Sequence, residues 1–102
     1  MIRIRTHLMT SDKARAEILV NGLVQGVGFR YFVVKHASRL KLNGYVNNLF
    51  TGEVHTVVEG DKVNIEELFN LIKLGPSHAH VKNSRIDWFE NKNEFESFKV
   101  KF

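Results

Sequence analysis

The stretch Gly22-Leu23-Val24-Gln25-Gly26-Val27-Gly28-Phe29-Arg30 decides how we expect this 102-residue chain to fold. It places three glycines around a short apolar run and ends in an arginine, where a helical pattern begins. Glycines let the backbone turn tightly, and backbone N–H groups at a helix N-terminus can surround a small anion. A turn whose glycines serve only geometry would look the same, so the rest of the chain must separate the two interpretations.

The residues on either side of this stretch predict a strand and a helix. From Arg15 to Val20, apolar and polar residues alternate as in a half-buried strand. After the glycines, apolar residues recur every three or four positions, which predicts an amphipathic helix from Gly28 or Phe29. Its expected buried stripe is Phe29, Phe32, Val33, His36, Ala37 and Leu40, with His36 in the core or at its boundary. Arg30 falls in the first turn, where a cation is unfavourable unless an anion binds nearby.

The middle of the chain predicts a hairpin followed by a second helix. Residues 45–49 and 54–59 flank a glycine-containing turn, which is typical of two paired strands. Asp61 is in position to cap a helix whose apolar residues keep the helical spacing. Gly75-Pro76 should end that helix.

The last part of the chain predicts two more strands, at 81–89 and at 98–102, separated by a turn at 91–93. Trp88 and the phenylalanines at strand or helix spacing are expected in the core. The order of elements predicts an α+β fold, a ferredoxin-like α/β sandwich (βαββαβ) with an antiparallel sheet and two helices on one face. We expect one domain over residues 14–102, preceded by a mobile basic arm at 1–13.

The composition limits the classes of protein to which the chain can belong. One proline and 25% charged residues are ordinary values for a globular domain. There are no cysteines, which excludes disulfides, thiolate zinc sites and a cysteine nucleophile. The net charge of +4 attracts anions without selecting one. No apolar run could span a bilayer and residues 1–13 lack the apolar centre of a secretory signal, so we expect a cytoplasmic protein without a membrane partner.

The glycine stretch fits neither of the two common nucleotide-binding motifs. It lacks the Lys-Ser/Thr of a P-loop, and its glycine spacing differs from that of the dinucleotide fingerprint. The segment 26–32 resembles part of the aromatic signature of RRM domains, which share the expected topology and bind RNA. That signature belongs on a third strand, whereas here it follows the first and its aromatics fall on the helix stripe. The expected third strand, 54–59, contains no aromatic residue on which a base could stack.

Two separated motifs make the sequence similar to the acylphosphatases. The first is Gly22-x-Val24-Gln25-Gly26-Val27-x-Phe29-Arg30, and the second is Gly44-aromatic-Val46-x-Asn48 followed by Gly52. The similarity continues through Gly75-Pro76 to the Glu94-Phe95-x-x-Phe98 ending. Departures from the family pattern are Lys41, Tyr45, Asn47 and Thr51, and none of them is a residue to which the resemblance assigns a chemical role.

The resemblance implies a ferredoxin-like fold and hydrolysis of acyl phosphates to carboxylate and inorganic phosphate without a metal or other cofactor. By position, it assigns phosphate binding to Arg30 and orientation of the attacking water to Asn48. The released carboxylate is the base of an acid with a pKa near 4, so it needs no proton donor at neutral pH. The expected phosphate-binding loop consists of Gln25, Gly26, Val27, Gly28, Phe29 and Arg30.

These expectations leave some alternatives open. His78-x-His80 could chelate a metal, but two loop histidines without nearby acids more often face solvent. We expect a monomer whose partners are a small acyl phosphate and inorganic phosphate or another anion, and we do not expect nucleic acid as a partner. The alternative function is a non-catalytic, ferredoxin-like module that binds RNA or a protein partner.

Overall fold

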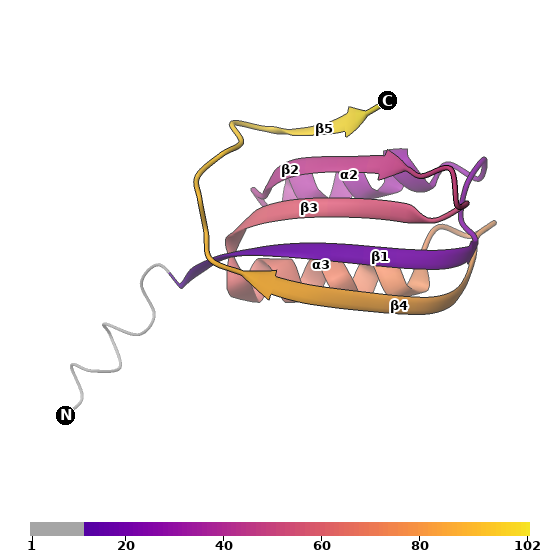
Figure 1. Ribbon diagram of the computed structural model, residues 1–102, viewed down its shortest axis with the longest axis horizontal. Coiled ribbons are helices and arrows are strands. Elements are labelled where there is room, and N and C mark those ends of the chain that lie inside the picture. Colours follow the sequence, from indigo (N-terminus) through magenta and orange to yellow (C-terminus); the bar gives the residue numbers. More distant parts are fainter. Residues whose placement is uncertain (1–11) are drawn as a thin grey trace.

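The computed structural model describes residues 12–102, which form a five-stranded sheet with two helices on one face (Figure 1). The elements in chain order are β1 (Lys13–Leu23), α2 (Phe29–Arg39), β2 (Asn43–Asn48), β3 (Val54–Asp61), α3 (Lys62–Leu74), β4 (His80–Phe89) and β5 (Phe98–Lys101). This confirms the predicted ferredoxin-like α+β fold. Of the expected basic arm, residues 1–11 lie outside the described residues, and Lys13 is the first residue of β1.

The sheet is mixed, and the expectation of an antiparallel sheet was wrong in its last strand. The order is β4-β1-β3-β2-β5, in which β5 pairs with β2 in parallel and all other pairs are antiparallel. The reason is the path of the chain after β4. Residues 90–97 cross to the opposite edge at the same end of the sheet, so β5 must run in the direction of β2 (Figure 1).

An ion pair beneath this crossing segment holds it to the sheet. Glu59, only 4% exposed, accepts hydrogen bonds from the backbone N–H groups of Lys92 at 2.9 Å and Glu94 at 2.8 Å. Arg15 donates to Glu59 at 2.9 Å and to the Glu94 carboxylate at 2.8 Å. Burial acts to raise the pKa of Glu59, but the two N–H groups and Arg15 outweigh it and leave that pKa below its usual value.

The core lies between the sheet and the helices, largely at the positions that the apolar periodicities predict. Val54, Thr56 and Val58 of β3 are buried there. Phe29 and Val33 of α2 are also buried. Half-buried His36 lies at the boundary, with its ring 4.6 Å from that of Phe32.

Some of the aromatic residues expected in the core are at the surface instead. Trp88 is 38% exposed, because β4 is an edge strand, and the Nζ atom of Lys62 lies 5.3 Å from its ring. Phe89 is also exposed, and Phe102 lies beyond the end of β5 with 95% of its surface exposed.

The helix ends differ from expectation in their details. Asp61 occupies the N-cap position of α3, but its side chain makes no capping hydrogen bond and lies 3.5 Å from the Nζ of Lys13. Gly75 ends α3 as predicted. At the end of α2, Lys41 adopts a left-handed φ of 60°, and Leu42 N–H donates to the Ala37 carbonyl at 2.9 Å. This is the Schellman arrangement, with lysine where glycine would be unstrained.

Among residues 12–102, no helix is long and apolar enough to cross a membrane.

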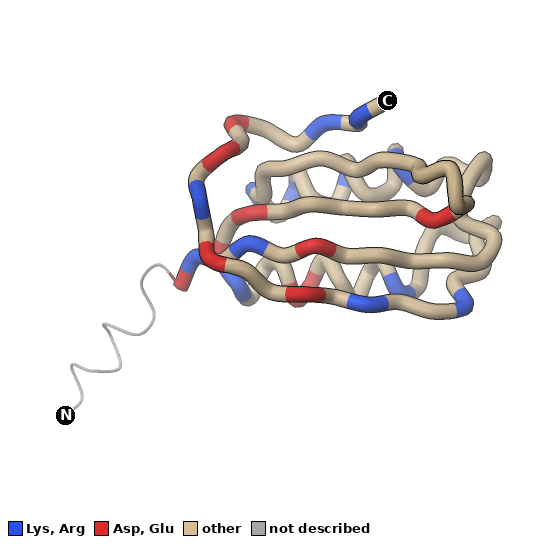
Figure 2. Tube along the Cα trace, viewed as in Figure 1, with Lys and Arg blue, Asp and Glu red and all other residues tan. Residues whose placement is uncertain are grey.

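Most acidic residues of this part of the chain lie towards the end of the sheet where residues 90–97 cross (Figure 2). The glycine stretch lies at the other end, after β1, so its surroundings carry less negative charge.

Candidate active site

The three glycines of the first motif have two different roles. Gly22 belongs to β1, next to a register shift, and a Cβ atom there would overlap the carbonyl oxygen of His80 on β4. It therefore permits close approach of two strands. Gly26 and Gly28 follow the strand with φ values of 75° and 78°, and a Cβ on either would meet open space. These two glycines shape the loop itself.

The loop leads into a helix N-terminus without a local capping group. Gly28 is the N-cap of α2, no side chain of the described residues caps the helix, and its first turn contains no acidic residue. The first backbone N–H groups of a helix have no partner within the helix and lie at the positive end of its dipole. Arg30 lies in this turn, half-buried, and forms no ion pair with any carboxylate of residues 12–102. The arrangement is suited to an anion that approaches from outside.

Gln25 connects the loop to the β2–β3 turn. Its Nε2 donates to the carbonyl oxygens of Leu49 at 2.8 Å and Glu53 at 3.0 Å. The side chain is thus engaged away from the loop interior, and only its backbone is available to an anion. Because Leu49 follows Asn48 directly, this tether also sets the distance between the loop and the end of β2.

Asn48 is the last residue of β2, and its side chain has an unusual property. Its Oδ1 atom is buried and accepts no hydrogen bond from any of residues 12–102. Buried polar atoms in native proteins nearly always have a partner, so an orphaned carbonyl oxygen needs a functional or solvent partner. Asn48 therefore presents an unused acceptor at the strand end.

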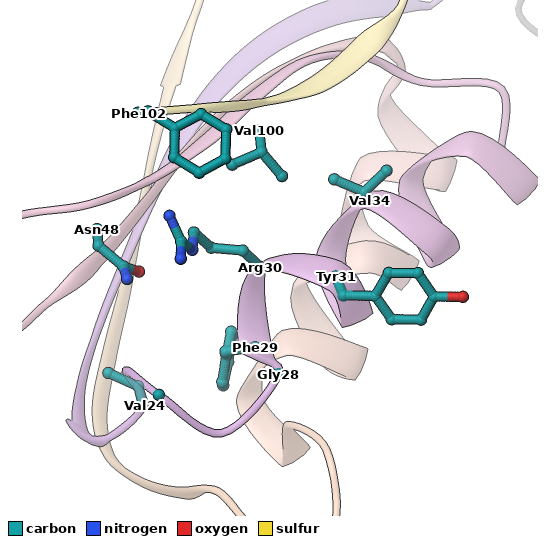
Figure 3. A pocket seen from close by; sticks show the side chains of 10 residues that line it. Val24, Gly28, Phe29, Arg30, Tyr31, Val34, Asn48, Val100 and Phe102 are labelled. Atoms are coloured by element: carbon teal, nitrogen blue, oxygen red, sulfur yellow. The ribbon is translucent and has the colours of Figure 1, made fainter.

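A pocket of about 310 Å³ brings these elements together. Its lining consists of Val24, Gly26, Gly28, Phe29, Arg30, Tyr31, Val34, Asn48, Val100 and Phe102. Figure 3 shows the guanidinium group of Arg30 pointing into the space between Asn48 and the ring of Phe102, whereas Tyr31 points away. Of the residues expected in the site, Gln25 and Val27 do not line the pocket, and the other expected residues do.

A sequence profile of the acylphosphatase family matches residues 16–100, nearly the whole part of the chain that forms the fold. The chain belongs to the acylphosphatase family. This confirms the family predicted from the two motifs, and with it the prediction of an acylphosphatase, a hydrolase.

Individual members of the family agree in sequence and in structure. A protein of Moorella thermoacetica named acylphosphatase is 45% identical over 80 residues, which cover 78% of this chain and 86% of that protein. One from Caldivirga maquilingensis is 43% identical over 89 residues, covering 86% and 94%. The crystal structure of acylphosphatase from Bacillus subtilis superposes with a TM-score of 0.84 at 30% identity, covering 87% of this chain and 99% of that chain.

Reasoning from the sequence missed half of the pocket of this acylphosphatase. Val24, Tyr31, Val34, Val100 and Phe102 line it, but none was expected there. Val34 follows Arg30 by one helical turn, which was a usable signal. Val100 and Phe102 come from β5, and nothing local in the sequence indicates that this strand pairs beside β2.

The other candidate sites find no support among the described residues. Residues 12–102 contain no group of three acidic, histidine or cysteine side chains that could hold a metal, and His78 and His80 are exposed. The aromatics of the RRM-like segment do not lie on the open sheet face. Phe29 is buried and Phe32 half-buried, both in α2.

Proposed function

We propose that this acylphosphatase hydrolyses acyl phosphates at the pocket between the glycine loop and the end of β2. The loop and Arg30 hold the phosphoryl group, and Asn48 orients the attacking water. The observation that carries the proposal is the pairing, in one pocket, of an arginine and a buried amide oxygen that have no carboxylate partner and no donor, respectively, among residues 12–102.

The phosphoryl group has a suitable binding surface on the loop side of the pocket. Backbone N–H groups from Gly26 to Arg30 can donate to its oxygens, and the positive end of α2 favours its charge. Arg30 adds a planar group of donors that can bind two oxygens at once. Catalysis of phosphoryl transfer depends mainly on such positioning and on electrostatic stabilisation, because charge spreads over the phosphoryl oxygens in the transition state.

Asn48 is suited to the water because its amide both accepts and donates hydrogen bonds. Its Oδ1 can accept from the attacking water, which would satisfy the orphaned acceptor, while Nδ2 can donate to a phosphoryl oxygen. The water oxygen forms a bond to phosphorus as the bond between phosphorus and the acyl oxygen breaks. The bond electrons leave with the carboxylate, and the water proton passes to the phosphate product or to solvent.

The pocket needs no acid for the leaving group. Among residues 12–102, those lining it include no Asp, Glu, His or Cys, and the hydroxyl-bearing ring of Tyr31 points away from it (Figure 3). Since a carboxylate leaves without protonation at neutral pH, acyl phosphates match this set of residues. Alkyl phosphate esters, which release a far more basic alkoxide, do not.

The proposal is tested by assaying benzoyl phosphate hydrolysis at neutral pH, with and without a metal chelator. We expect hydrolysis that the chelator does not change. No hydrolysis above the uncatalysed rate would overturn the function, and loss of activity with chelator would overturn the metal-free mechanism. Salt-dependent RNA binding that persists in Arg30→Ala, without hydrolysis, would support the alternative of a non-catalytic binding module.

We also propose that the protein is cytoplasmic and acts as a monomer. One chain supplies both Arg30 and Asn48 to the pocket. Light scattering during gel filtration at assay concentration should give the mass of one chain, 11.8 kDa. Activity found only in a fraction of larger mass would contradict this part.

A further inference from the structure

The lining of the pocket differs between the two sides of Arg30. One side has the backbone of the glycine loop at Gly26 and Gly28, together with Val24 and Phe29. The opposite side consists of the side chains of Val34, Val100 and Phe102, as Figure 3 shows. An acyl phosphate also has two different parts, an anionic phosphoryl group and an acyl group.

We propose that Val34, Val100 and Phe102 form a subsite for the acyl group and that it selects apolar acyl groups, above all aromatic ones. The inference rests on the proposed function and adds the class of acyl phosphate. Phe102 is the principal specificity-determining residue of this subsite, and it is not required for the chemical step.

The position of Phe102 follows from the parallel pairing of β5 with β2. Val46 pairs with Val100 and Asn47 with Lys101, so the next residues along the two strands are Asn48 and Phe102. The ring therefore adjoins the residue that is proposed to orient the water. An acyl group attached to a phosphoryl group between Asn48 and Arg30 would be close to this ring.

One face of the Phe102 ring contacts Arg30, and most of the remaining ring surface is exposed to solvent. The Cζ atom of Arg30 lies 5.2 Å from the ring centre, a cation–π contact that leaves the N–H groups at the guanidinium edge available to phosphate. Phe102 is nevertheless 95% exposed, so most of its apolar surface contacts water. Covering that surface with an apolar acyl group is favourable, and an aromatic acyl group adds ring–ring attraction.

Charge argues against acidic acyl groups. Of the described residues that line the pocket, Arg30 alone has a charged side chain, and the phosphoryl group engages it. A carboxylate or second phosphate on the acyl group would lose hydration against valine and phenylalanine without a cation in compensation. The subsite therefore disfavours acyl groups that bear a second anion.

The test compares kcat/KM for benzoyl, acetyl and succinyl phosphate in the parent, Phe102→Ala and Phe102→Leu. Ratios between variants are used, because the intrinsic reactivity of each substrate then cancels. We expect Phe102→Ala to lower the value for benzoyl phosphate about fivefold to tenfold, with a smaller loss in Phe102→Leu. Acetyl and succinyl phosphate should change less than about twofold, as should inhibition by inorganic phosphate.

Phe50→Ala is the matched control, because Phe50 is a fully exposed phenylalanine that does not line the pocket. It should change none of these values. Equal losses for benzoyl and acetyl phosphate in Phe102→Ala would overturn the subsite and show that the ring acts only through Arg30. Unchanged values for both would overturn it as well. If the parent hydrolyses none of the three substrates, it is the proposed function itself that fails.

Discussion

The two junctions at which a strand passes into a helix differ sharply in this molecule. Between β1 and α2, residues 24–28 form a loop with two left-handed glycines, an uncapped helix N-terminus and Arg30 in the first turn. Between β3 and α3 there is no loop, since Asp61 ends the strand and Lys62 begins the helix. The Lys62 backbone N–H donates to the carbonyl oxygen of Asp12 at 2.9 Å.

The junctions lie at opposite ends of the sheet, because β1 and β3 are antiparallel neighbours. The β1–α2 end carries the pocket, whereas the β3–α3 end carries the buried Glu59 and its hydrogen bonds to the crossing segment. Both helices have a positive N-terminus, so a helix dipole alone does not make an anion site. The difference comes from the loop, from a facing polar group and from Arg30, which has no carboxylate partner in the described part of the chain. We expect mutations at the first end to affect activity and mutations at the second to affect stability.

The largest effect should come from removing the cation of the β1–α2 junction. Arg30→Ala should lower kcat/KM for benzoyl phosphate about 10²- to 10³-fold, as for other preorganised donors, and weaken inhibition by inorganic phosphate. The matched control is Lys62→Ala, which removes the cation from the first turn of α3 and should leave kcat/KM within about twofold. Equal effects of the two mutations would show that the junctions do not differ as described.

Asn48→Ala should lower kcat about 10²-fold, because it removes the acceptor that orients the water. Inhibition by inorganic phosphate should change by less than about threefold, since Arg30 and the loop remain. Asn47→Ala is the control on the opposite face of the same strand, and we expect it to keep nearly full activity. A loss confined to phosphate affinity would assign Asn48 to binding and leave the orientation of the water unexplained.

At the other end of the sheet, Glu59→Gln should lower the free energy of unfolding by about 2 kcal/mol, because charge-assisted hydrogen bonds are lost in a buried setting. Activity per folded molecule should stay near that of the parent. Glu17→Gln, a more exposed carboxylate on the same sheet face, should cost less than about 1 kcal/mol. Denaturant unfolding followed by fluorescence measures both.

The same residue predicts how stability depends on pH. The pKa of Glu59 is lower in the folded than in the unfolded state, so its stabilisation is complete above its unfolded pKa. It is lost as the pH falls below about 4.5 and through the folded pKa. Glu59→Gln should therefore flatten the acid limb of the stability curve. An unchanged slope would mean that other carboxylates dominate acid unfolding.

The smallest effects are expected from alanine substitutions at two left-handed glycines, one in the pocket loop and one outside it. Comparing them distinguishes a change in the geometry of the loop from backbone strain alone. Gly28 and Gly52 have φ values of 78° and 96° with open space for a Cβ, so alanine at either should cost about 1 kcal/mol of stability. Only Gly28→Ala should also lower kcat/KM, about tenfold, because the N–H groups of the pocket shift. Equal kcat/KM values for both variants would show that the loop tolerates this displacement.

The sequence-based predictions succeeded where a feature depends on residues close together in the sequence, and failed where it depends on residues far apart. The strands, the helices and the positions of Arg30 and Asn48 were predicted, because periodicity and motif spacing are local properties of the chain. The buried contacts of Glu59, the exposure of Trp88 and the tether formed by Gln25 were not predicted. Each depends on which distant backbone groups meet, and no spacing within the sequence specifies that.

The sequence by itself therefore determined the family, the α+β class and the loop side of the pocket. The tertiary structure alone decided that Gly22 serves strand packing, that β5 runs parallel to β2 and that Phe102 covers one face of Arg30. The physical reason is that strand pairing acts between segments far apart in the chain. Only the crossing of residues 90–97 places Val100 and Phe102 beside Arg30 and the glycine loop.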